Sequence, residues 1–300
     1  MLDFRVETFL AVCRHMNFTK AARELNITQP AVSHHIHYLE QAYGTALFQH
    51  NGKRLQLTEA GEILRRTLLT MKHDEQHLQK RMQQAAFGTR DYSFGATLSV
   101  AEFMINEALG RFLQLHPDSH IQMQVADTKV LLSKLDSGEL DFAVVEGDFP
   151  KAEYDFFVFG TEEYVAAGDP EKAARYRGRR LTDLLVEPLL LREEGSGTRV
   201  ILEYYLKEHG LAAADFARTV EIGNIGAIKT LLKSGYGVSF LYRAAIRPEE
   251  AAGTLGVIEL SDFRLRHDIM FLFPKNSNFR ADYTAIFREL RACAEETGSA

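Results

Sequence analysis

The sequence predicts an α/β protein with an all-α, winged-helix head, in which a helix-turn-helix and one long helix precede the α/β region. Two short helical segments joined by a tight turn occupy residues 17–40, and a hairpin signal follows at residues 51–52. An uninterrupted helical stretch then runs over residues 62–87. Beyond residue 91, strand-like and helix-like segments alternate, which is typical of α/β architecture with largely parallel strands.

Length and composition are those of a folded protein with more than one core. The 300 residues are 46% hydrophobic and 25% charged, which are ordinary globular values. Residues 1–88 hold 11 Lys or Arg against 8 Asp or Glu, a net charge of +3, whereas the remainder holds 24 against 33, a net charge of −9. A mildly basic head on an acidic body favours a nucleic-acid-binding module joined to a domain of another kind.

Several classes of protein are disfavoured. No apolar run reaches 18 residues and charges interrupt residues 1–7, so neither a membrane span nor a secretion signal is expected. Cys13 and Cys293 are the only cysteines, which is neither a disulfide framework nor a metal site. His73 and His77 have metal-ligand spacing, but we expect them to be solvated because no third ligand or HExxH pattern accompanies them. A cytoplasmic protein without metal or cofactor is expected.

Three helices are expected in the head. The first spans residues 3–15, the second residues 17–25 and the third residues 28–40. Small apolar residues on the second helix would let another helix approach closely, and the third has apolar residues at the 3.6-residue period. The expected packing residues are Phe4, Phe9, Val12, Ala21, Ala22, Leu25, Val32, Ile36, Leu39 and Tyr43.

The outward face of the third helix is polar and has short side chains at its N-terminal end. Thr28 can cap the helix, and Pro30 falls in the first turn, where a missing N–H costs little. Gln29 suits a bidentate contact with adenine, and Ser33 can bond to bases or phosphates. The alternative is an ordinary helical hairpin with a solvated polar face. The expected DNA-contacting residues of this helix are Thr28, Gln29, Pro30, Ser33, His34 and His37.

A hairpin follows the helices. Asn51-Gly52 lies between two short alternating segments and is a strong two-residue turn signal, because both positions tolerate positive φ. Lys53 and Arg54 would then lie on a wing, where a cation can reach a phosphate or the minor groove. A solvated turn charge is the alternative, but the preceding helices favour a DNA contact.

The long helix begins after Thr58 and carries a regular apolar stripe. Positions 64, 68, 71, 75, 78, 82 and 85 alternate spacings of four and three, and all but Glu75 are apolar. This pattern predicts a coiled-coil seam, although a core face is the alternative. Pairing between two subunits would present two recognition helices to a palindromic DNA site.

The head motifs resemble the N-terminal domain of LysR-type transcriptional regulators. The resemblance rests on residues 18–25, 29–33, 39–40, 47–48 and 57–61, whose order and spacing match without gaps. His34 and His37 depart from the family, which often has Arg there. Because neutral histidine attracts phosphate weakly, we expect the attraction to be weaker and to depend on pH. The resemblance implies promoter DNA and a small effector as partners, a homodimer through the linker helix, a homotetramer, and RNA polymerase as a further partner.

The resemblance also implies two α/β subdomains joined by two crossovers, as in periplasmic solute-binding proteins. The predicted division gives residues 1–58 to the head, 59–88 to the linker helix and 89–300 to the regulatory region. Within that region, subdomain 1 comprises residues 89–162 and 268–300, and subdomain 2 comprises residues 163–267. The sequence predicts strands at residues 92–98, 121–125, 140–145, 163–167, 188–191, 219–222, 238–241 and 268–273, and helices at 101–115, 130–137, 198–209, 226–234 and 280–296.

Four loops should meet beyond the carboxyl ends of the strands, where open α/β sheets bind ligands. Each places hydroxyl or amide side chains and free backbone N–H groups at a helix N-terminus, which attracts anions. Arg199 adds a fork for carboxylate, sulfate or phosphate. Simple helix capping is the alternative, as is an ion pair of Arg199 with Glu193 or Glu194. The predicted effector-binding residues are Thr97, Ser99, Thr128, Ser196, Gly197, Thr198, Arg199 and Asn224.

The segment 192–199 also resembles a subset of LysR-type regulators of sulfur assimilation and carbon fixation, which implies a small oxyanion or organic acid as effector. An enzyme is disfavoured, because Glu194 replaces the first glycine of a GxSxG elbow and no P-loop, dinucleotide fingerprint or zinc pattern is present. The sequence therefore predicts a one-component transcription regulator. The alternatives are a cytoplasmic solute-binding or sensor protein whose first 88 residues only mediate assembly, and an enzyme of anion metabolism.

Overall fold

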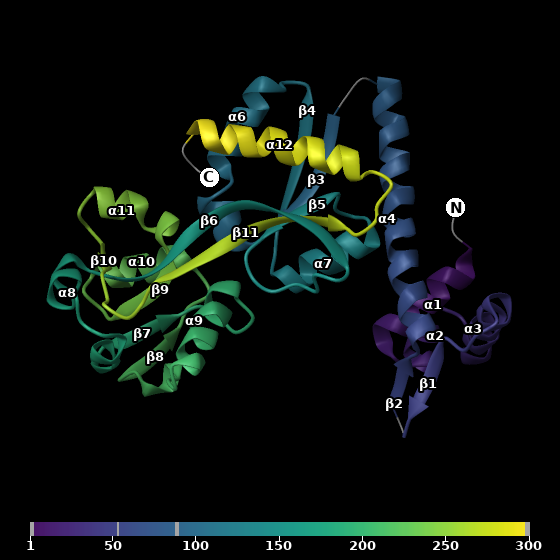
Figure 1. The fold of residues 1–300 in the computed structure, drawn as a ribbon, viewed down its shortest axis with the longest axis horizontal. Coiled ribbons are helices and arrows are strands. Elements are labelled where there is room, and N and C mark those ends of the chain that lie inside the picture. Colours follow the sequence, from purple (N-terminus) through teal and green to yellow (C-terminus); the bar gives the residue numbers. More distant parts are fainter. Residues whose placement is uncertain (1–2, 53, 88–89, 298–300) are drawn as a thin grey trace.

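The computed structural model describes residues 3–52, 54–87 and 90–297. A small head, the long helix α4 (Glu59–Phe87) and an α/β region of two lobes follow one another along the molecule (Figure 1). The head contains α1 (Phe4–His15), α2 (Phe18–Glu24), α3 (Gln29–Tyr43) and the hairpin of β1 (Phe48–Asn51) and β2 (Arg54–Leu57). This is the winged helix-turn-helix that the sequence predicts.

The head is built around the predicted apolar residues with two exceptions. Phe9, Val12, Ala21 and Val32 are fully buried. The prediction is wrong for Phe4 and Tyr43, which are 59% and 57% exposed. Each lies at a helix end: the Phe4 ring packs edge-on against His35 at 4.7 Å, and Tyr43 is the last residue of α3.

The hairpin differs from the prediction at Asn51. This residue pairs with Arg54 as the last residue of β1, so it is a strand residue and not a turn residue. Gly52 has φ of +61°, a conformation that glycine adopts without steric cost. Lys53 lies outside the described residues.

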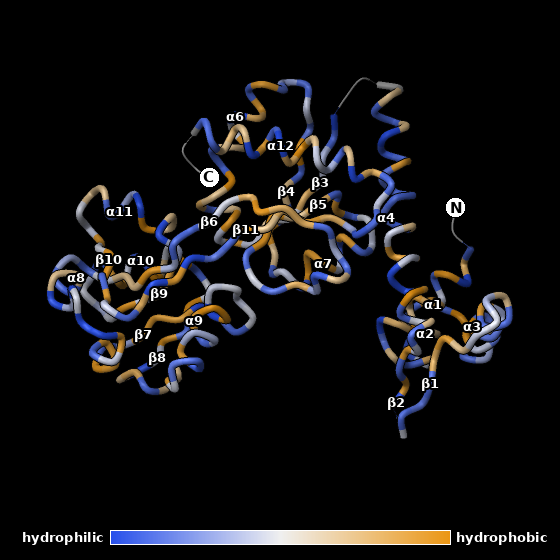
Figure 2. The backbone as a smooth tube through the Cα atoms, in the orientation of Figure 1, coloured by the Kyte–Doolittle hydropathy of each residue, from blue (hydrophilic) through white to orange (hydrophobic). Residues whose placement is uncertain are grey.

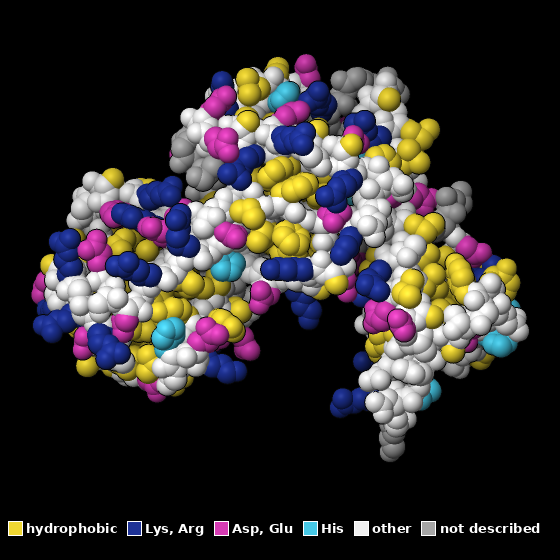
Figure 3. Space-filling view, in the orientation of Figure 1, with side chains coloured by type: hydrophobic (Ala, Val, Ile, Leu, Met, Phe, Trp, Pro, Cys, Tyr) yellow, Lys and Arg dark blue, Asp and Glu magenta, His cyan; other side chains and the backbone are white. Residues whose placement is uncertain are grey.

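The stripe predicted on α4 divides into two parts. Leu64 and Leu68 pack into the head core, because the first turns of α4 lie against α1 and β2. Farther along, Met71, Leu78 and Met82 stay exposed, and Ile63 extends this apolar stripe toward the head. Figure 3 shows hydrophobic side chains gathered over the outer side of α4.

The opposite side of α4 packs against the α/β region, so the prediction that His73 and His77 are solvated is wrong. Both imidazoles are buried. His73 Nε2 lies 2.9 Å from Leu140 O, and His77 Nδ1 lies 3.3 Å from Asp141 Oδ1. No group of three metal-ligating side chains occurs in the part of the chain that the structure describes.

Two long antiparallel strands join the lobes of the α/β region. They are β6 (Tyr154–Gly168) and β11 (Leu265–Pro274), which cross from one lobe to the other in Figure 1. The strand order is β4-β3-β5-β11-β6-β9-β7-β8, and β10 (Gly256–Ile258) pairs with β6. The remaining strands pair in parallel within each lobe: β3 (Arg90–Ala96), β4 (Ser119–Val125) and β5 (Phe142–Val145), then β7 (Pro188–Leu191), β8 (Arg218–Glu221) and β9 (Val238–Tyr242).

Helices cover these strands. Two predicted elements differ: the helix expected at residues 101–115 is broken at Met104 and Ile105 into two helices, and the strand expected at residues 163–167 is only the end of β6. The α-helices are α5 (Leu98–Phe103), α6 (Asn106–Leu115), α7 (Thr128–Ser137), α8 (Pro170–Arg175), α9 (Gly197–Glu208), α10 (Ile225–Lys233), α11 (Arg247–Ala251) and α12 (Arg280–Thr297), and the 3-10 turns are Leu181–Val186, Ala213–Asp215 and Arg243–Ala245.

Apolar segments concentrate in the strands of both lobes and on the helix faces beneath them (Figure 2).

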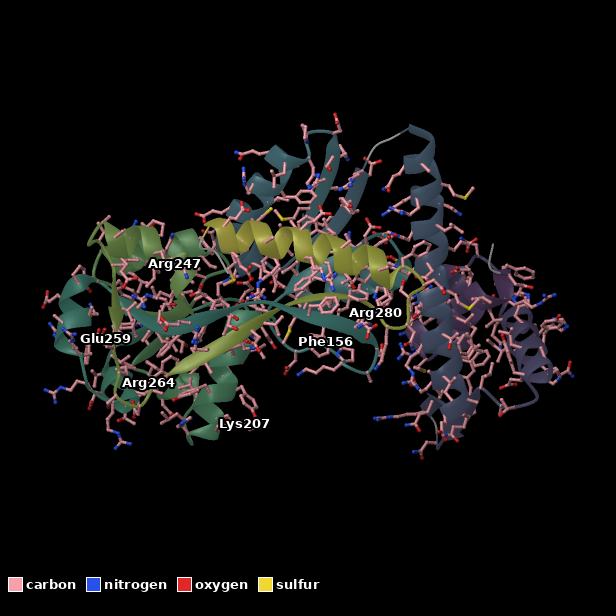
Figure 4. The ribbon with its side chains drawn as sticks, turned by 45° about the horizontal axis from the view of Figure 1, so that its top comes forward. Phe156, Lys207, Arg247, Glu259, Arg264 and Arg280 are labelled. Atoms are coloured by element: carbon pink, nitrogen blue, oxygen red, sulfur yellow. The ribbon has the colours of Figure 1, made fainter. Side chains whose placement is uncertain are left out.

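Ion pairs connect two helices to the crossing strands: Arg247 of α11 pairs with Glu162 at 2.8 Å, and Arg280 at the start of α12 pairs with Asp155 (Figure 4). Within the described residues, no helix is long and apolar enough to cross a membrane.

Asp136 at the end of α7 gives a prediction about pH. Burial, with a contribution from Glu153, raises the pKa of Asp136 to about 6 from its ordinary 3.8, although it accepts a hydrogen bond from Tyr154 at 2.8 Å. The folded protein therefore keeps this proton to a higher pH than the unfolded chain. The free energy of unfolding should fall by about 3 kcal/mol in all from this group as the pH rises from well below 4 to well above 6.

Asp136→Asn should remove that fall. We expect the variant to match the native protein below pH 4 and to be more stable above pH 6, as measured by denaturant unfolding at several pH values. Asp118→Asn, at an exposed position, is the matched control. Equal pH profiles for Asp136→Asn and the native protein would contradict the prediction.

Candidate functional site

The N-terminal end of α3 presents a polar, exposed face. Thr28 caps the helix by accepting a hydrogen bond from Ala31 N at 3.3 Å, and Pro30 follows in the first turn. Gln29 Nε2 donates to Ser33 Oγ at 2.9 Å, so these two side chains lie side by side one turn apart. Both retain further polar atoms for base edges, which is what a recognition helix in the major groove needs.

Two further predicted DNA-contacting residues, both histidines, lie on the same helix. His34 and His37 are exposed, and His37 Nε2 lies 3.0 Å from the Gln41 side-chain amide. The neighbouring His35 points inward instead and contacts Thr8 Oγ1 at 2.9 Å. At the wing, Arg54 is exposed, so its cation is free to meet a phosphate.

Four of the predicted effector-binding residues converge on a residue that sequence reasoning missed, Glu146. It follows β5 directly and is buried. The Thr97 hydroxyl donates to its carboxylate, and Thr128 Oγ1 donates to its backbone oxygen at 3.1 Å. Gly197 lies against the same side chain, since a Cβ on Gly197 would come within 3.3 Å of Glu146 Cγ.

Opposing influences act on the pKa of the Glu146 carboxyl. Burial raises the pKa of the Glu146 carboxyl, while hydrogen bonds from Thr97 and Ser99 and the charge of Arg192 act in the opposite direction. The Ser99 hydroxyl lies close enough to lower the pKa of the Glu146 carboxyl. Its geometry does not meet the standard criteria for a hydrogen bond. The signal in the sequence was a carboxylate directly after a wholly apolar strand, at the edge where the hydroxyl-bearing loops meet.

The first turn of α9 brings the second lobe to this point. Ser196 Oγ and Thr198 Oγ1 are buried and lie 2.9 Å apart. Tyr164 Oη lies 2.7 Å from Thr198 O, which fixes the turn against β6. The first turn of α9 in the second lobe therefore lies against Glu146 of the first lobe, with buried hydroxyl groups on both sides of the contact.

The two other predicted effector residues have partners elsewhere. Arg199 pairs with Glu203 at 2.7 Å and Glu221 at 2.6 Å, and these hydrogen bonds raise its pKa. Asn224 Oδ1 accepts from Ala227 N at 2.9 Å and caps α10. Both side chains thus make the structural contacts that were the alternatives to ligand binding, although the ion-pair partners of Arg199 differ from the expected Glu193 and Glu194.

Two family models match successive parts of the chain. Residues 5–62 match the family described as "Bacterial regulatory helix-turn-helix protein, lysR family". Residues 89–294 match "LysR substrate binding domain". Similar proteins include a RuBisCO operon transcriptional regulator of Acidithiobacillus ferrooxidans, 28% identical over 97% of this chain and 94% of the relative. The regulator CysL of Bacillus subtilis is 26% identical over 89% of each chain.

Solved structures share the fold. Full-length LysG of Corynebacterium glutamicum with bound effector Arg has a TM-score of 0.62 at 18% identity, and covers 99% of both chains. The regulatory domain of Synechocystis CcmR in complex with 2-PG has a TM-score of 0.61 at 20% identity over 68% of this chain and 97% of that one. Together the two family models match most of the chain, and the chain belongs to the LysR family of transcriptional regulators.

Proposed function

We propose that this protein is a sequence-specific promoter-binding regulator whose DNA binding is modulated by a small organic acid in the cleft between the lobes. The observation that supports the proposed DNA binding most directly is the exposed Gln29–Ser33 pair at the start of α3. Thr28, Pro30, His34 and His37 flank this pair, and Lys53 and Arg54 act from the wing. The regulator would act in the cytoplasm, where the chromosome lies.

The proposed effector binding is supported by hydroxyl groups that both lobes contribute around Glu146. Thr97, Thr128, Ser196 and Thr198 come from both lobes, so a ligand that bonds to both would favour one relative placement of the lobes. An effector changes DNA binding only if it has different affinities for the two placements. LysG and CcmR, which share the fold, are described with a bound amino acid and with 2-PG.

Association of several subunits would couple effector binding to DNA binding. We propose a homodimer through the exposed stripe Ile63, Met71, Leu78 and Met82 of α4, because apolar side chains at helical spacing pair with another helix. Two dimers would form a tetramer that bends or spaces bound DNA, with RNA polymerase as a further contact. The head would comprise residues 1–58, the linker helix 59–88, subdomain 1 residues 89–162 and 268–300, and subdomain 2 residues 163–267.

The test of the DNA half is the double variant Gln29→Ala, Ser33→Ala. Each lost base contact costs about 1–3 kcal/mol, so we expect at least a tenfold loss of preference for the selected duplex over random duplex. Binding to random duplex, which depends on cations and phosphates, should change little. Fluorescence anisotropy at fixed salt measures both affinities.

Gln83→Ala, at an exposed position on α4, is the matched control and should bind as the native protein does. If the double variant kept the native preference for specific DNA, the assignment of the recognition helix would be wrong. A native protein with no preference for any duplex would favour a solute-binding or sensor role instead.

A further inference from the structure

The contact between the lobes contains a buried carboxyl group that belongs to the chain itself. The carboxylate of Glu146 is 3% exposed and accepts the hydrogen bond of Thr97, a side chain predicted to bind an effector anion. It also packs against Gly197 at the start of α9, where its Oε1 lies 3.5 Å from the position of a Cβ. One predicted anion-binding position is therefore already occupied by a carboxyl group of the chain itself.

This buried charge has no directly bonded cation among the described residues. Arg192 attracts Glu146 electrostatically, but its guanidinium donates two hydrogen bonds of 2.7 Å to Glu193. The partners that remain to Glu146 are neutral hydroxyls. Burying a carboxylate with neutral partners alone is unfavourable, because its lost hydration is only partly replaced.

A buried hydroxyl of the other lobe has no hydrogen-bond partner among the described residues. Tyr242 ends β9 in the other lobe, is 1% exposed and makes no hydrogen bond through its hydroxyl. Burial and the charge of Glu146 raise the pKa of the Tyr242 phenol. Ser99 in the first lobe likewise has a buried hydroxyl without a partner. Buried hydroxyls are normally hydrogen-bonded, so one unpartnered hydroxyl in each lobe points to a ligand that bonds to both.

We propose that the effector is an organic acid that also carries an ammonium group, and that this ammonium donates to the Glu146 carboxylate. The inference rests on the effector half of the proposed function and narrows its ligand class. An acid without an amine would bring a second negative charge toward Glu146, and like charges in a poorly hydrated site repel strongly. The ammonium supplies the missing counter-charge, and an acceptor on the ligand would satisfy the Tyr242 hydroxyl.

The experiment compares ligand pairs that differ only in the amine. The full-length protein and the variant Glu146→Gln are each titrated with alanine and propionate, aspartate and succinate, and glutamate and glutarate, by thermal shift and calorimetry. We expect at least one amine-bearing acid to bind the native protein about tenfold or more tightly than its partner without the amine. Glu146→Gln keeps the volume and removes the charge, so this discrimination should disappear.

Asp118→Asn is the matched control, because it makes the same change from carboxylate to amide at an exposed position and should leave ligand binding unchanged. The proposal is overturned if no amine-bearing acid binds in a way that depends on Glu146, or if the acid without the amine binds equally well. Binding of such acids, lost in Thr97→Val, would refute the amine while supporting the effector cleft. Specific DNA binding is measured on the same protein. If the protein still prefers a specific duplex, the proposed promoter binding holds whichever result the ligand titrations give.

Discussion

Replacing Asp141 with alanine is expected to destabilise the protein by about 3–5 kcal/mol, because it leaves a buried network without its central charge. Asp141 accepts from His77 Nδ1 at 3.3 Å, Lys80 Nζ at 3.0 Å and Ser93 N at 2.7 Å. Burial acts to raise the pKa of Asp141, but the hydrogen bond from His77 and the charge of Lys80 outweigh it and lower the pKa. The network joins α4 to the first lobe, so its loss loosens the connection between head and regulatory region.

Denaturant unfolding of the full chain measures this effect. Lys80→Ala, which removes a more exposed partner, should cost less than about 1 kcal/mol. Asp141→Asn keeps an acceptor for Ser93 N and should fall between the two. A loss below 1 kcal/mol for Asp141→Ala would show that the network does not hold α4 to the lobe.

The second large effect is expected for Gly61→Ala in the first turns of α4. A Cβ on Gly61 would lie 2.2 Å from the backbone oxygen of Leu47 and 2.7 Å from Leu57 Cδ2. The carbonyl oxygen cannot move aside without moving the start of the wing. We therefore expect a loss of about 3 kcal/mol or more in the stability of the head, together with loss of specific DNA binding.

Gly110→Ala is the matched control, because α6 leaves open space at that position. Alanine lowers the entropy of the unfolded chain and should stabilise the protein by about 0.5–1 kcal/mol. Thermal unfolding of both variants measures the contrast. Native stability and native DNA affinity in Gly61→Ala would show that the wing is not packed on α4 as described.

The head could be predicted in detail because its signals are local. The cap at Thr28, the apolar period of α3 and the turn glycine each depend on a few neighbouring residues. Phe4 and Tyr43 were assigned to the core because periodicity does not indicate where a helix projects beyond its neighbours. The α4 stripe was predicted as one seam, but which turns pack in the head and which stay exposed depends on tertiary contacts.

The candidate effector site was harder to predict, because Glu146 meets the other site residues through contacts between segments that are distant in the sequence. The loops with Thr97, Thr128 and Gly197 were found from hydroxyls and glycines at helix starts, which are local signals. Their convergence on Glu146 depends on how β5 and α9 meet. Arg199 was a reasonable candidate for a ligand contact, yet Glu203 one turn away and Glu221 on the next strand take its hydrogen bonds. His73 and His77 likewise gained their partners only through packing of α4.

Selection from a pool of random duplexes tests the central claim, specific recognition of promoter DNA, most directly. The full-length protein should enrich a partly palindromic sequence whose half-sites lie one or more helical turns apart, because paired heads present two α3 helices. Sequences recovered by the Gln29→Ala, Ser33→Ala variant should lose the bases that this pair reads. A folded native protein that enriches no sequence above the starting pool would contradict the claim.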